Sequence, residues 1–334
     1  MQTQLPHSDP LRVLVLEPFG VGSHAAMNRG WKAASQHELT LLELPGVHWK
    51  WRSRHGSLTL ARQAIELWNA GQRFDVVFCS DMLNLPEWRG FAGPLASLPS
   101  VAYFHENQFT YPLATGQTRD FHYAYSNVLT CTAADRVWFN SDFHRQEFGD
   151  AVRAWLRRMP DYAHLDLFEA ALARSQICPP GIQVPDLLPR RDAIIKARTP
   201  LTIGWVARWE HDKRPDRFLE LVRELLALNL EFRLVLLGQQ FRHADPSFLA
   251  VQELAGSRVL HSGYAASRDA YWHWLSQIDL VLSTADHEFF GIGVLEAVAA
   301  GAKALLPRRL AYPEVFELTT CPDRVLVSMP TRAS

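Results

Sequence analysis

The feature that most constrains the fold is a recurring unit: a short apolar run, a turn with glycine or charged residues, then a helical segment. Short apolar runs bounded by such turns are typical of buried parallel strands. In the first half, residues 11–16 lead into Gly20 and Gly22 and a predicted helix over 23–34. In the second half, residues 201–206 lead into a charged turn and a predicted helix over 215–227. Two such series predict two doubly wound α/β domains.

The predicted elements follow this alternation. The first series has strands at 11–16, 39–44, 74–80, 101–104 and 136–140 and helices at 23–34 and 123–134, with Ser141 as the N-cap of a further helix. The second has strands at 201–206, 232–238, 258–263, 280–284 and 303–306 and helices at 215–227, 269–277, 294–300 and 312–316. Residues 184–200 are rich in proline and charge and are predicted to link a first domain, 1–183, to a second, 201–334.

Composition excludes several classes of protein. The 334 residues are 48% hydrophobic with a net charge of −1, which argues against disorder and against a global attraction to nucleic acid or membranes. The four cysteines form no C-x-x-C pair, so neither a zinc site nor a disulfide framework is expected. The sequence shows no signal-peptide pattern and no apolar run of bilayer length. We therefore expect a soluble, cytoplasmic protein.

Residues 285–297, read as A-D-H-E-F-F-G-I-G-V-L-E-A, form the most informative turn. It joins a predicted strand to a predicted helix, and it places His287, Gly291 and Gly293 around or between Glu288 and Glu296. The N–H groups at the start of a helix favour an anion such as a diphosphate. Carboxylates accept hydrogen bonds from hydroxyl groups, as a sugar or ribose would offer. The first hypothesis is therefore a sugar-nucleotide site.

Arg208 and Lys213 follow the first strand of the second series. We expect them at the same rim as the glycines of residues 285–297, where two cations would bind a diphosphate and stabilise its departure. No D-x-D pair that would hold a divalent ion on the phosphates accompanies them, so no metal or other cofactor is expected. The alternative is that these cations pair only with Glu210 and Asp212. Together with the spacing of Glu288 and Glu296, the sequence favours the diphosphate site.

Polar residues also gather at the end of a strand in the first domain. His105, Glu106, Asn107 and Gln108 directly follow the strand at 101–104, and such a cluster is costly to bury without a ligand. The first glycine turn, F-G-V-G-S-H, lacks the G-x-G-x-x-G spacing of a dinucleotide site, which disfavours a nicotinamide cofactor.

Residues 48–55, H-W-K-W-R-S-R-H, alternate cations with indoles. We expect a loop here. One interpretation is a solvated loop with tryptophans tucked beneath it. The other is a nucleic-acid surface, on which Lys50, Arg52 and Arg54 meet phosphates and Trp51 stacks on a base. Spacing alone does not decide between the two.

Several motifs together resemble one known family. R-W-E-H-D-K, H-E-F-F-G and the spacing of Glu288 and Glu296 look like retaining glycosyltransferases of family 4, which have the GT-B architecture of two Rossmann-like domains facing a cleft. E-P-F-G-V-G-S-H, H-W-K-W-R, Y-F-H-E-N-Q, H-S-G-Y and Y-P-E-V-F extend the resemblance to the tRNA-queuosine α-mannosyltransferase family. The matching motifs run from about residue 11 to 316.

This resemblance implies transfer of mannose from GDP-mannose to the cyclopentenediol of queuosine at the wobble position of an aspartate tRNA, with retained anomeric configuration. It implies a catalytic group of His105, Glu288, Arg208 and Lys213. The implied donor site consists of Gly22, Arg208, Lys213, His287, Glu288, Phe289, Phe290, Gly291 and Glu296, with Glu288 on the sugar and Glu296 on the ribose. The implied acceptor and tRNA site consists of Lys50, Trp51, Arg52, Arg54, Glu106, Asn107 and Gln108.

Two details depart from the family pattern. Val21 separates two glycines that we expect to be adjacent, and residues after 316 do not predict the helix that usually crosses back onto the first domain. Three other functions are weighed. A glycosyltransferase for a lipid or polysaccharide would need an amphipathic basic helix near the cleft. A non-catalytic tRNA-binding module would be expected to lose Glu288, Arg208 or Lys213, and an epimerase would need an acid/base pair that the sequence does not reveal.

Overall fold

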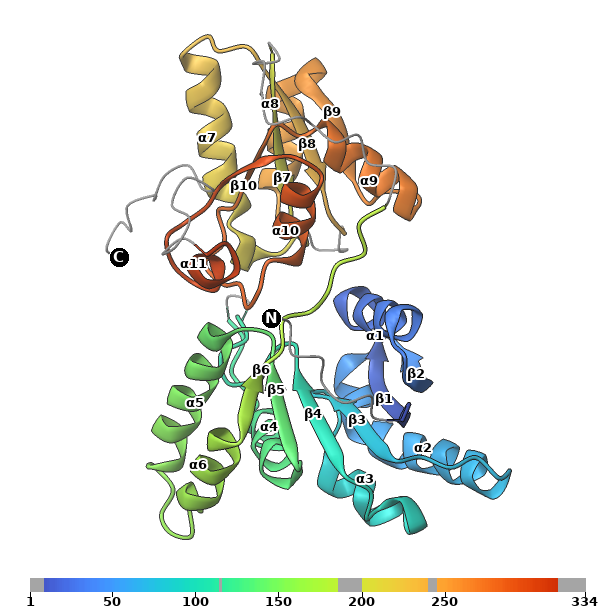
Figure 1. Cartoon of the computed structure of the whole chain (residues 1–334). Coiled ribbons are helices and arrows are strands. Elements are labelled where there is room, and N and C mark those ends of the chain that lie inside the picture. Colours follow the sequence, from blue (N-terminus) through green and yellow to red (C-terminus); the bar gives the residue numbers. More distant parts are fainter. Residues whose placement is uncertain (1–8, 114–115, 186–199, 240–244, 318–334) are drawn as a thin grey trace, which may run out of the picture. The chain divides into compact units, whose positions relative to one another are not determined.

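A computed structural model describes residues 9–113, 116–185, 200–239 and 245–317. The chain divides into two compact units, Met1–Gly181 and Ile182–Ser334, which are described separately (Figure 1). Each unit has one parallel sheet with helices on both faces, so the predicted doubly wound α/β class is confirmed for each. Most of the predicted linker lies outside the described residues, and so do residues 318–334, for which no crossover helix is predicted.

The first unit has a six-stranded sheet of order β2-β1-β3-β4-β5-β6. The strands are β1 (Arg12–Gly20), β2 (Glu38–Pro45), β3 (Val76–Ser80), β4 (Ser100–Phe104), β5 (Arg136–Phe139) and β6 (Ser175–Ile177). The helices are α1 (Gly22–Ala34), α2 (Trp49–Asn69), α3 (Leu85–Phe91), the 3₁₀ turn η1 (Gly93–Leu95), α4 (Phe121–Ala133), α5 (Asp142–Leu156) and α6 (Leu165–Ala173).

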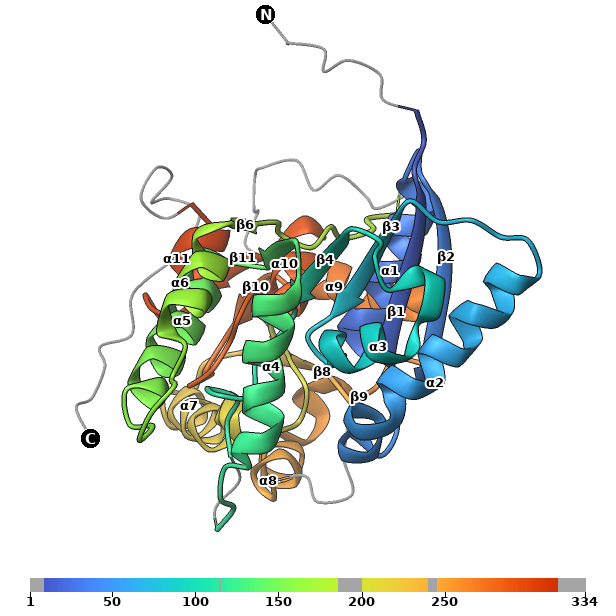
Figure 2. The same ribbon diagram turned by 90° about the horizontal axis from the view of Figure 1, so that it is seen from below.

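Alternate residues of these strands face two separate cores. Leu14, Val77 and Phe104 pack with α2 to α6 on one face, whereas Val13 and Phe78 pack with α1 on the other. This period of two is the one expected of a strand buried on both sides. Figure 2 shows the strands and helices of this unit from a second direction.

One predicted loop is in fact a helix. Residues 49–55 form the start of α2, and His48 is its N-cap, in a left-handed conformation with φ of 53°. The helix is held by its next turns, where Leu60, Ala61 and Ala64 make an apolar stripe against the sheet. The prediction was wrong because the exposed first turns, with glycine, histidine and arginine, carry no apolar periodicity of their own.

The second unit has a five-stranded sheet of order β11-β10-β7-β8-β9. Its strands are β7 (Leu201–Val206), β8 (Phe232–Leu237), β9 (Val259–Gly263), β10 (Leu280–Leu282) and β11 (Lys303–Leu305). Its helices are α7 (Pro215–Ala227), α8 (Ser247–Ala255), α9 (Arg268–Gln277), α10 (Ile292–Ala299) and α11 (Tyr312–Val315), with 3₁₀ turns η2 (His211–Lys213) and η3 (Gly256–Arg258). No helix in the described part of the chain is long and apolar enough to cross a bilayer.

The order of each sheet reverses direction at one point. In the first unit it lies between β1 and β3, and in the second between β7 and β10. The turns after such neighbouring strands leave to opposite faces of a parallel sheet, which creates a crevice at the carboxyl edge where ligands bind in this class of fold. Residues 207–213 and 283–291 are the turns at this point of the second unit, and the second of these overlaps the stretch 285–297 that was singled out from the sequence.

Gly238 allows the turn after β7 to approach β8. A Cβ atom at Gly238 would lie 1.8 Å from the Ala207 carbonyl oxygen. We predict that Gly238→Ala lowers the free energy of unfolding by about 1–3 kcal/mol, because the added methyl group forces the backbone apart. Gly90→Ala in α3 is the control, since its Cβ would meet nothing within 4 Å and alanine favours a helix. Thermal unfolding of both variants measures the effect, and equal midpoints would contradict the prediction.

Candidate active site

Two glycines at the start of α10 have different structural roles. Gly291 is the N-cap of α10 with φ of 91°, a conformation that side chains disfavour. A Cβ atom at Gly293 would lie 3.1 Å from the Val206 carbonyl oxygen, so glycine lets α10 pack closely on β7. No side chain of the described residues caps the start of α10. Its first N–H groups therefore suit an anionic ligand.

Lys213 is buried beside this turn, with 6% of its surface exposed. Its Nζ donates to the His287 carbonyl oxygen at 2.7 Å and pairs with Asp212 Oδ2 at 3.0 Å and Glu288 Oε2 at 3.2 Å. Burial lowers the pKa of Lys213, but Glu288 and Asp212 outweigh it and leave the pKa above its usual value. Burial likewise raises the pKa of Glu288, but Lys213 outweighs it, and the net shift is downward. Both groups are therefore charged.

Arg208 is half-exposed and pairs with Glu210, with 3.3 Å between Nη2 and Oε2. Both pairs of the alternative interpretation, Arg208–Glu210 and Lys213–Asp212, are thus present. They do not account for the whole arrangement, because Lys213 also binds Glu288 and the positive charge of Arg208 contributes to the lowered pKa of Glu288. The structure brings Arg208, Lys213 and Glu288 together.

The residues around Glu288 complete this cluster. His287 lies edge-on to Phe289 at 4.3 Å, and its pKa falls to about 4 because of burial and then because of the nearby Lys213. Its imidazole is therefore neutral at neutral pH. Phe289 and Phe290 are buried, and the Phe290 N–H donates to Glu288 Oε1 at 3.5 Å. A role for these residues toward a donor stays a prediction.

Glu296 lies apart from this group, on α10. Its buried carboxylate accepts from Arg268 Nη2 at 2.5 Å and from the Tyr271 hydroxyl at 2.7 Å. Both partners are on α9, and no spacing in the sequence links them to Glu296. Two hydrogen bonds leave further lone pairs on the carboxylate for a hydroxyl ligand, so the predicted ribose contact stays a prediction.

Asp286 holds the turn between β10 and α10 in place through three arginines. It accepts from Arg214 at 2.6 Å, Arg217 at 2.6 Å and Arg309 at 2.9 Å. Burial raises the pKa of Asp286, but the three guanidinium groups outweigh it and lower the pKa. Sequence analysis missed this contact, because the arginines come from separate segments.

In the first unit, the turn after β1 carries Gly22, the first residue of α1, with φ of 57°. Two residues that sequence analysis missed flank it. The buried Glu17 Oε2 pairs with His24 Nδ1 at 3.0 Å, and the His24 ring stacks on His105 with 3.9 Å between centroids. The E-P-F-G-V-G-S-H motif contains both residues, but only the fold shows that they meet His105.

The pKa values of His24, His105 and Asp81 in this buried cluster shift in different directions. Burial lowers the pKa of His24, but Glu17 and more distant carboxylates raise it to about 9. Burial and then the His24 charge lower the pKa of His105. Asp81 Oδ1 accepts the His105 N–H at 2.8 Å, and burial raises the pKa of Asp81 to about 8. A protonated His24 thus lies against a neutral His105.

Ligand atoms of Glu17, His24 and His105 all lie within 4.8 Å of one another, as a metal site requires. The rings of His24 and His105 are stacked, with 27° between their planes, and His24 Nδ1 already faces Glu17. Lone pairs of imidazole nitrogens lie in the ring plane, so two stacked rings do not converge on one ion. The geometry does not fit a metal, and metal-independent chemistry stays a prediction.

The predicted acceptor residues after β4 differ in their exposure. Asn107 is fully buried, and its Oδ1 accepts the N–H groups of Phe109 and Thr110 at 3.0 Å each, which folds its own loop. Glu106 and Gln108 are half-buried, with Gln108 Nε2 donating to Glu106 at 3.5 Å. A direct contact between Asn107 and an acceptor would require this loop to open.

The predicted tRNA residues lie on the first turns of α2. Lys50, Trp51 and Arg54 are exposed. Arg52 is half-buried and donates to the Pro45 carbonyl oxygen at 3.0 Å and contacts His55 Nε2 at 2.9 Å, so it also holds the start of the helix. Their role toward RNA stays a prediction.

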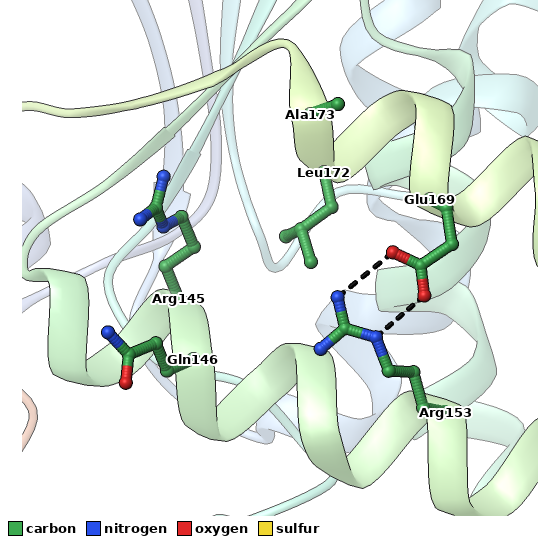
Figure 3. A pocket seen from close by; sticks show the side chains of 6 residues that line it. All are labelled: Arg145, Gln146, Arg153, Glu169, Leu172 and Ala173. Atoms are coloured by element: carbon green, nitrogen blue, oxygen red, sulfur yellow. Dashed lines mark hydrogen bonds and ion pairs between the residues drawn. The ribbon is translucent and has the colours of Figure 1, made fainter.

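A surface pocket between α5 and α6 lies outside these groups (Figure 3). Arg153 forms paired hydrogen bonds with Glu169, at 2.6 Å from Nε and 2.9 Å from Nη2. Arg153 is therefore already balanced by an anion, and Arg145, which also lines the pocket, pairs with Asp142. We assign no chemistry to the pocket.

The His24 cluster generates a prediction about pH. His24 and Asp81 both bind a proton more tightly when folded, so stability is greatest below their unfolded pKa values and falls as pH rises through about 8 to 9. We expect a loss of roughly 2–4 kcal/mol from His24 between about pH 6 and pH 9.5. His24→Gln should flatten this fall in denaturant-unfolding measurements, whereas His122→Gln at an exposed site should not. An unchanged pH slope in His24→Gln would contradict the assignment.

The fold of this chain resembles those of solved glycosyltransferase structures. The chain is similar to Anabaena Alr3699/HepE in complex with UDP and glucose, at 15% identity and a TM-score of 0.57 over 91% of this chain and 82% of that one. It is also similar to sucrose-phosphate synthase from Thermosynechococcus elongatus, at 15% identity and a TM-score of 0.58 over 90% and 82%. The predicted GT-B class, with its two parallel α/β units, is confirmed.

Comparison of sequences is more specific. Residues 12–182 match the N-terminal family model of tRNA-queuosine alpha-mannosyltransferase, and residues 190–326 match that of glycosyl transferases group 1. The tRNA-queuosine alpha-mannosyltransferase of Drosophila melanogaster is 32% identical over 91% of this chain and 81% of its own length. A GDP-mannose-dependent alpha-(1-6)-phosphatidylinositol dimannoside mannosyltransferase of Mycobacterium tuberculosis is 25% identical over 78% and 67%. The chain is a glycosyltransferase and belongs to the tRNA-queuosine alpha-mannosyltransferase family.

Proposed function

We propose that this enzyme transfers mannose from GDP-mannose to the cyclopentenediol of queuosine at the wobble position of tRNA-Asp, in the cytoplasm and with retained anomeric configuration. The observation that carries the donor half is the buried Lys213–Glu288 pair beside the start of α10. The acceptor half is supported by the match of residues 12–182 and by the name of the Drosophila relative. The name of the Mycobacterium tuberculosis relative supports GDP-mannose as the donor.

In this proposal the second unit holds the donor. Arg208, Lys213 and the N–H groups at the start of α10 bind the diphosphate, and Glu288 accepts hydrogen bonds from hydroxyl groups of the sugar. The bond between the anomeric carbon and the diphosphate oxygen breaks, and that carbon bonds to the acceptor oxygen on the same face. The acceptor proton passes to the departing phosphate oxygen. Cations and helix N–H groups stabilise the charge that develops on GDP.

No separate nucleophile or metal enters this scheme. Lys213 already carries a charge in its buried position, since Glu288 and Asp212 outweigh the effect of burial on its pKa. A charge fixed before the donor arrives costs little reorganisation during the reaction. Lys213 and Arg208 would therefore supply the electrostatic stabilisation that a divalent ion gives in other transferases.

A lipid acceptor is the second candidate, because the Mycobacterium tuberculosis relative is named for a phosphatidylinositol dimannoside. The test is incubation of the full chain with labelled GDP-mannose and with tRNA that contains or lacks queuosine. Label only in the queuosine-containing tRNA supports the proposal. Label in both tRNAs, in neither, or only in added phosphatidylinositol mannoside vesicles would overturn it.

The Lys213–Glu288 pair leads to a prediction about Glu288. Glu288→Gln retains the shape of the side chain but removes the charge, so we expect transfer to fall by about 100-fold or more. Glu253→Gln on the exposed face of α8 should have no effect. Initial rates at saturating tRNA and equilibrium binding of GDP distinguish lost catalysis from lost nucleotide binding. Retained transfer in Glu288→Gln would exclude the proposed sugar contact.

A further inference from the structure

Tyr123 of α4 joins the starts of α2 and α4. Its hydroxyl donates to the Lys50 carbonyl oxygen at 3.4 Å, its ring lies 5.1 Å from the Trp49 ring, and the Arg54 guanidinium lies 4.7 Å from its centroid. Tyr123 itself is buried. A second helix, α4, therefore holds the predicted basic segment in place, and sequence analysis had not connected the two.

Further aromatic rings surround the start of α4. Phe121 stacks on Trp155 of α5 at 5.6 Å with 17° between the planes, and Tyr125 lies 5.5 Å from the same ring. Phe121 and Tyr125 are four residues apart, so they share one face of α4. Both remain partly exposed, at 39% and 37%. Trp155 thus orients two aromatic side chains that still offer surface to solvent.

Trp51 is more exposed than Trp49, Phe121 or Tyr125, at 63%. Its ring contact in the described structure is with His55 at 5.0 Å. A tryptophan in this position contributes little to the core and leaves a large flat surface in water. Exposed aromatic groups of this kind mark sites of interaction when several occur together.

The charge around these rings is positive. Residues 46–59 contain no aspartate or glutamate, and Lys50 and Arg54 are exposed among them. Arg157 and Arg158 are exposed directly after α5. Asp120 is the acidic neighbour at the start of α4, and its Oδ1 accepts the His122 N–H at 3.0 Å. Flat rings among cations complement unpaired nucleotides, whose bases stack and whose phosphates are anionic.

We propose that the starts of α2 and α4 form a docking surface for unpaired nucleotides of the acceptor RNA, which extends around α4 from the side of Tyr123 to the side of Phe121 and Tyr125. This aromatic-basic surface consists of Trp49, Lys50, Trp51, Arg54, Phe121 and Tyr125. The inference rests on the proposed function, since that function supplies an RNA acceptor whose modified position lies in a loop. It adds the residues of α4 to the RNA site and assigns base stacking, in addition to charge, as the source of affinity.

The test uses the full chain and an anticodon stem-loop that lacks queuosine, with fluorescence anisotropy as the measure of binding. Trp51→Ala and Phe121→Ala should each weaken binding about 5- to 100-fold, because each removes a stacking partner. Trp51→Phe should retain most of the affinity. Phe91→Ala is the matched control, because Phe91 is 52% exposed but lies away from the start of α2. Its neighbour Gly93 is close to Ile65, which is near the other end of that helix.

Two further measurements separate stacking from charge and from folding. The slope of the logarithm of the RNA-binding constant against the logarithm of salt concentration reports the number of phosphate contacts. Lys50→Gln should lower this slope by the amount expected for about one contact, whereas Trp51→Ala should leave it unchanged. A fully paired RNA duplex should be less sensitive to Trp51→Ala than the stem-loop. Thermal unfolding confirms that each variant is folded.

The outcomes distinguish this inference from the proposed function. Normal stem-loop binding by folded Trp51→Ala and Phe121→Ala would overturn the docking surface, even if the wild-type enzyme transfers mannose to queuosine-containing tRNA. A larger rise in KM for GDP-mannose than in KM for tRNA would also overturn it. Failure of the wild-type enzyme to modify that tRNA would instead refute the proposed function.

Discussion

The arrangement of the second unit depends on one buried ammonium group. Lys213 Nζ lies among two carboxylates and a carbonyl oxygen, and its own carbonyl oxygen accepts the Thr284 hydroxyl at 2.7 Å. The Asp286 N–H donates to the Asp212 carbonyl oxygen at 2.8 Å beside it. These contacts join the turns after β7 and β10, the two neighbours at the reversal of strand order. An unpaired buried charge is costly, so each partner fixes the others.

The first unit also contains a buried cation that is balanced by a carboxylate, in this case the His24 imidazolium. Glu17 stabilises an imidazolium at His24, and that cation lies against the neutral ring of His105. Both clusters lie at the carboxyl edge of a parallel sheet, where strand ends leave polar groups and helix starts close together. In each cluster, burial and then a neighbouring cation lower the pKa of a histidine: the cation is Lys213 for His287 and His24 for His105.

Much of this fold could be predicted, because buried parallel strands are continuous apolar runs and Pro215 marks the start of α7. The failures have physical causes. The start of α2 is polar because it faces solvent, and α3, α6 and α8 are short helices that were not predicted. The segments with Arg208, Lys213 and Glu288 could be identified because their chemistry is local in sequence. The partners of Asp286, Glu296 and His105 could not, since tertiary structure alone brings them together.

The three arginines on Asp286 have a consequence for how this enzyme could change. Arg214 is the N-cap of α7, Arg217 lies in its first turn, and Arg309 follows β11. One carboxylate therefore ties the turn between β10 and α10 to two distant segments. A turn held from several directions has little freedom to adopt a new shape for a different sugar. Divergence in donor preference would therefore require coordinated substitutions across the unit, whereas the exposed helix starts of the first unit can diversify one residue at a time.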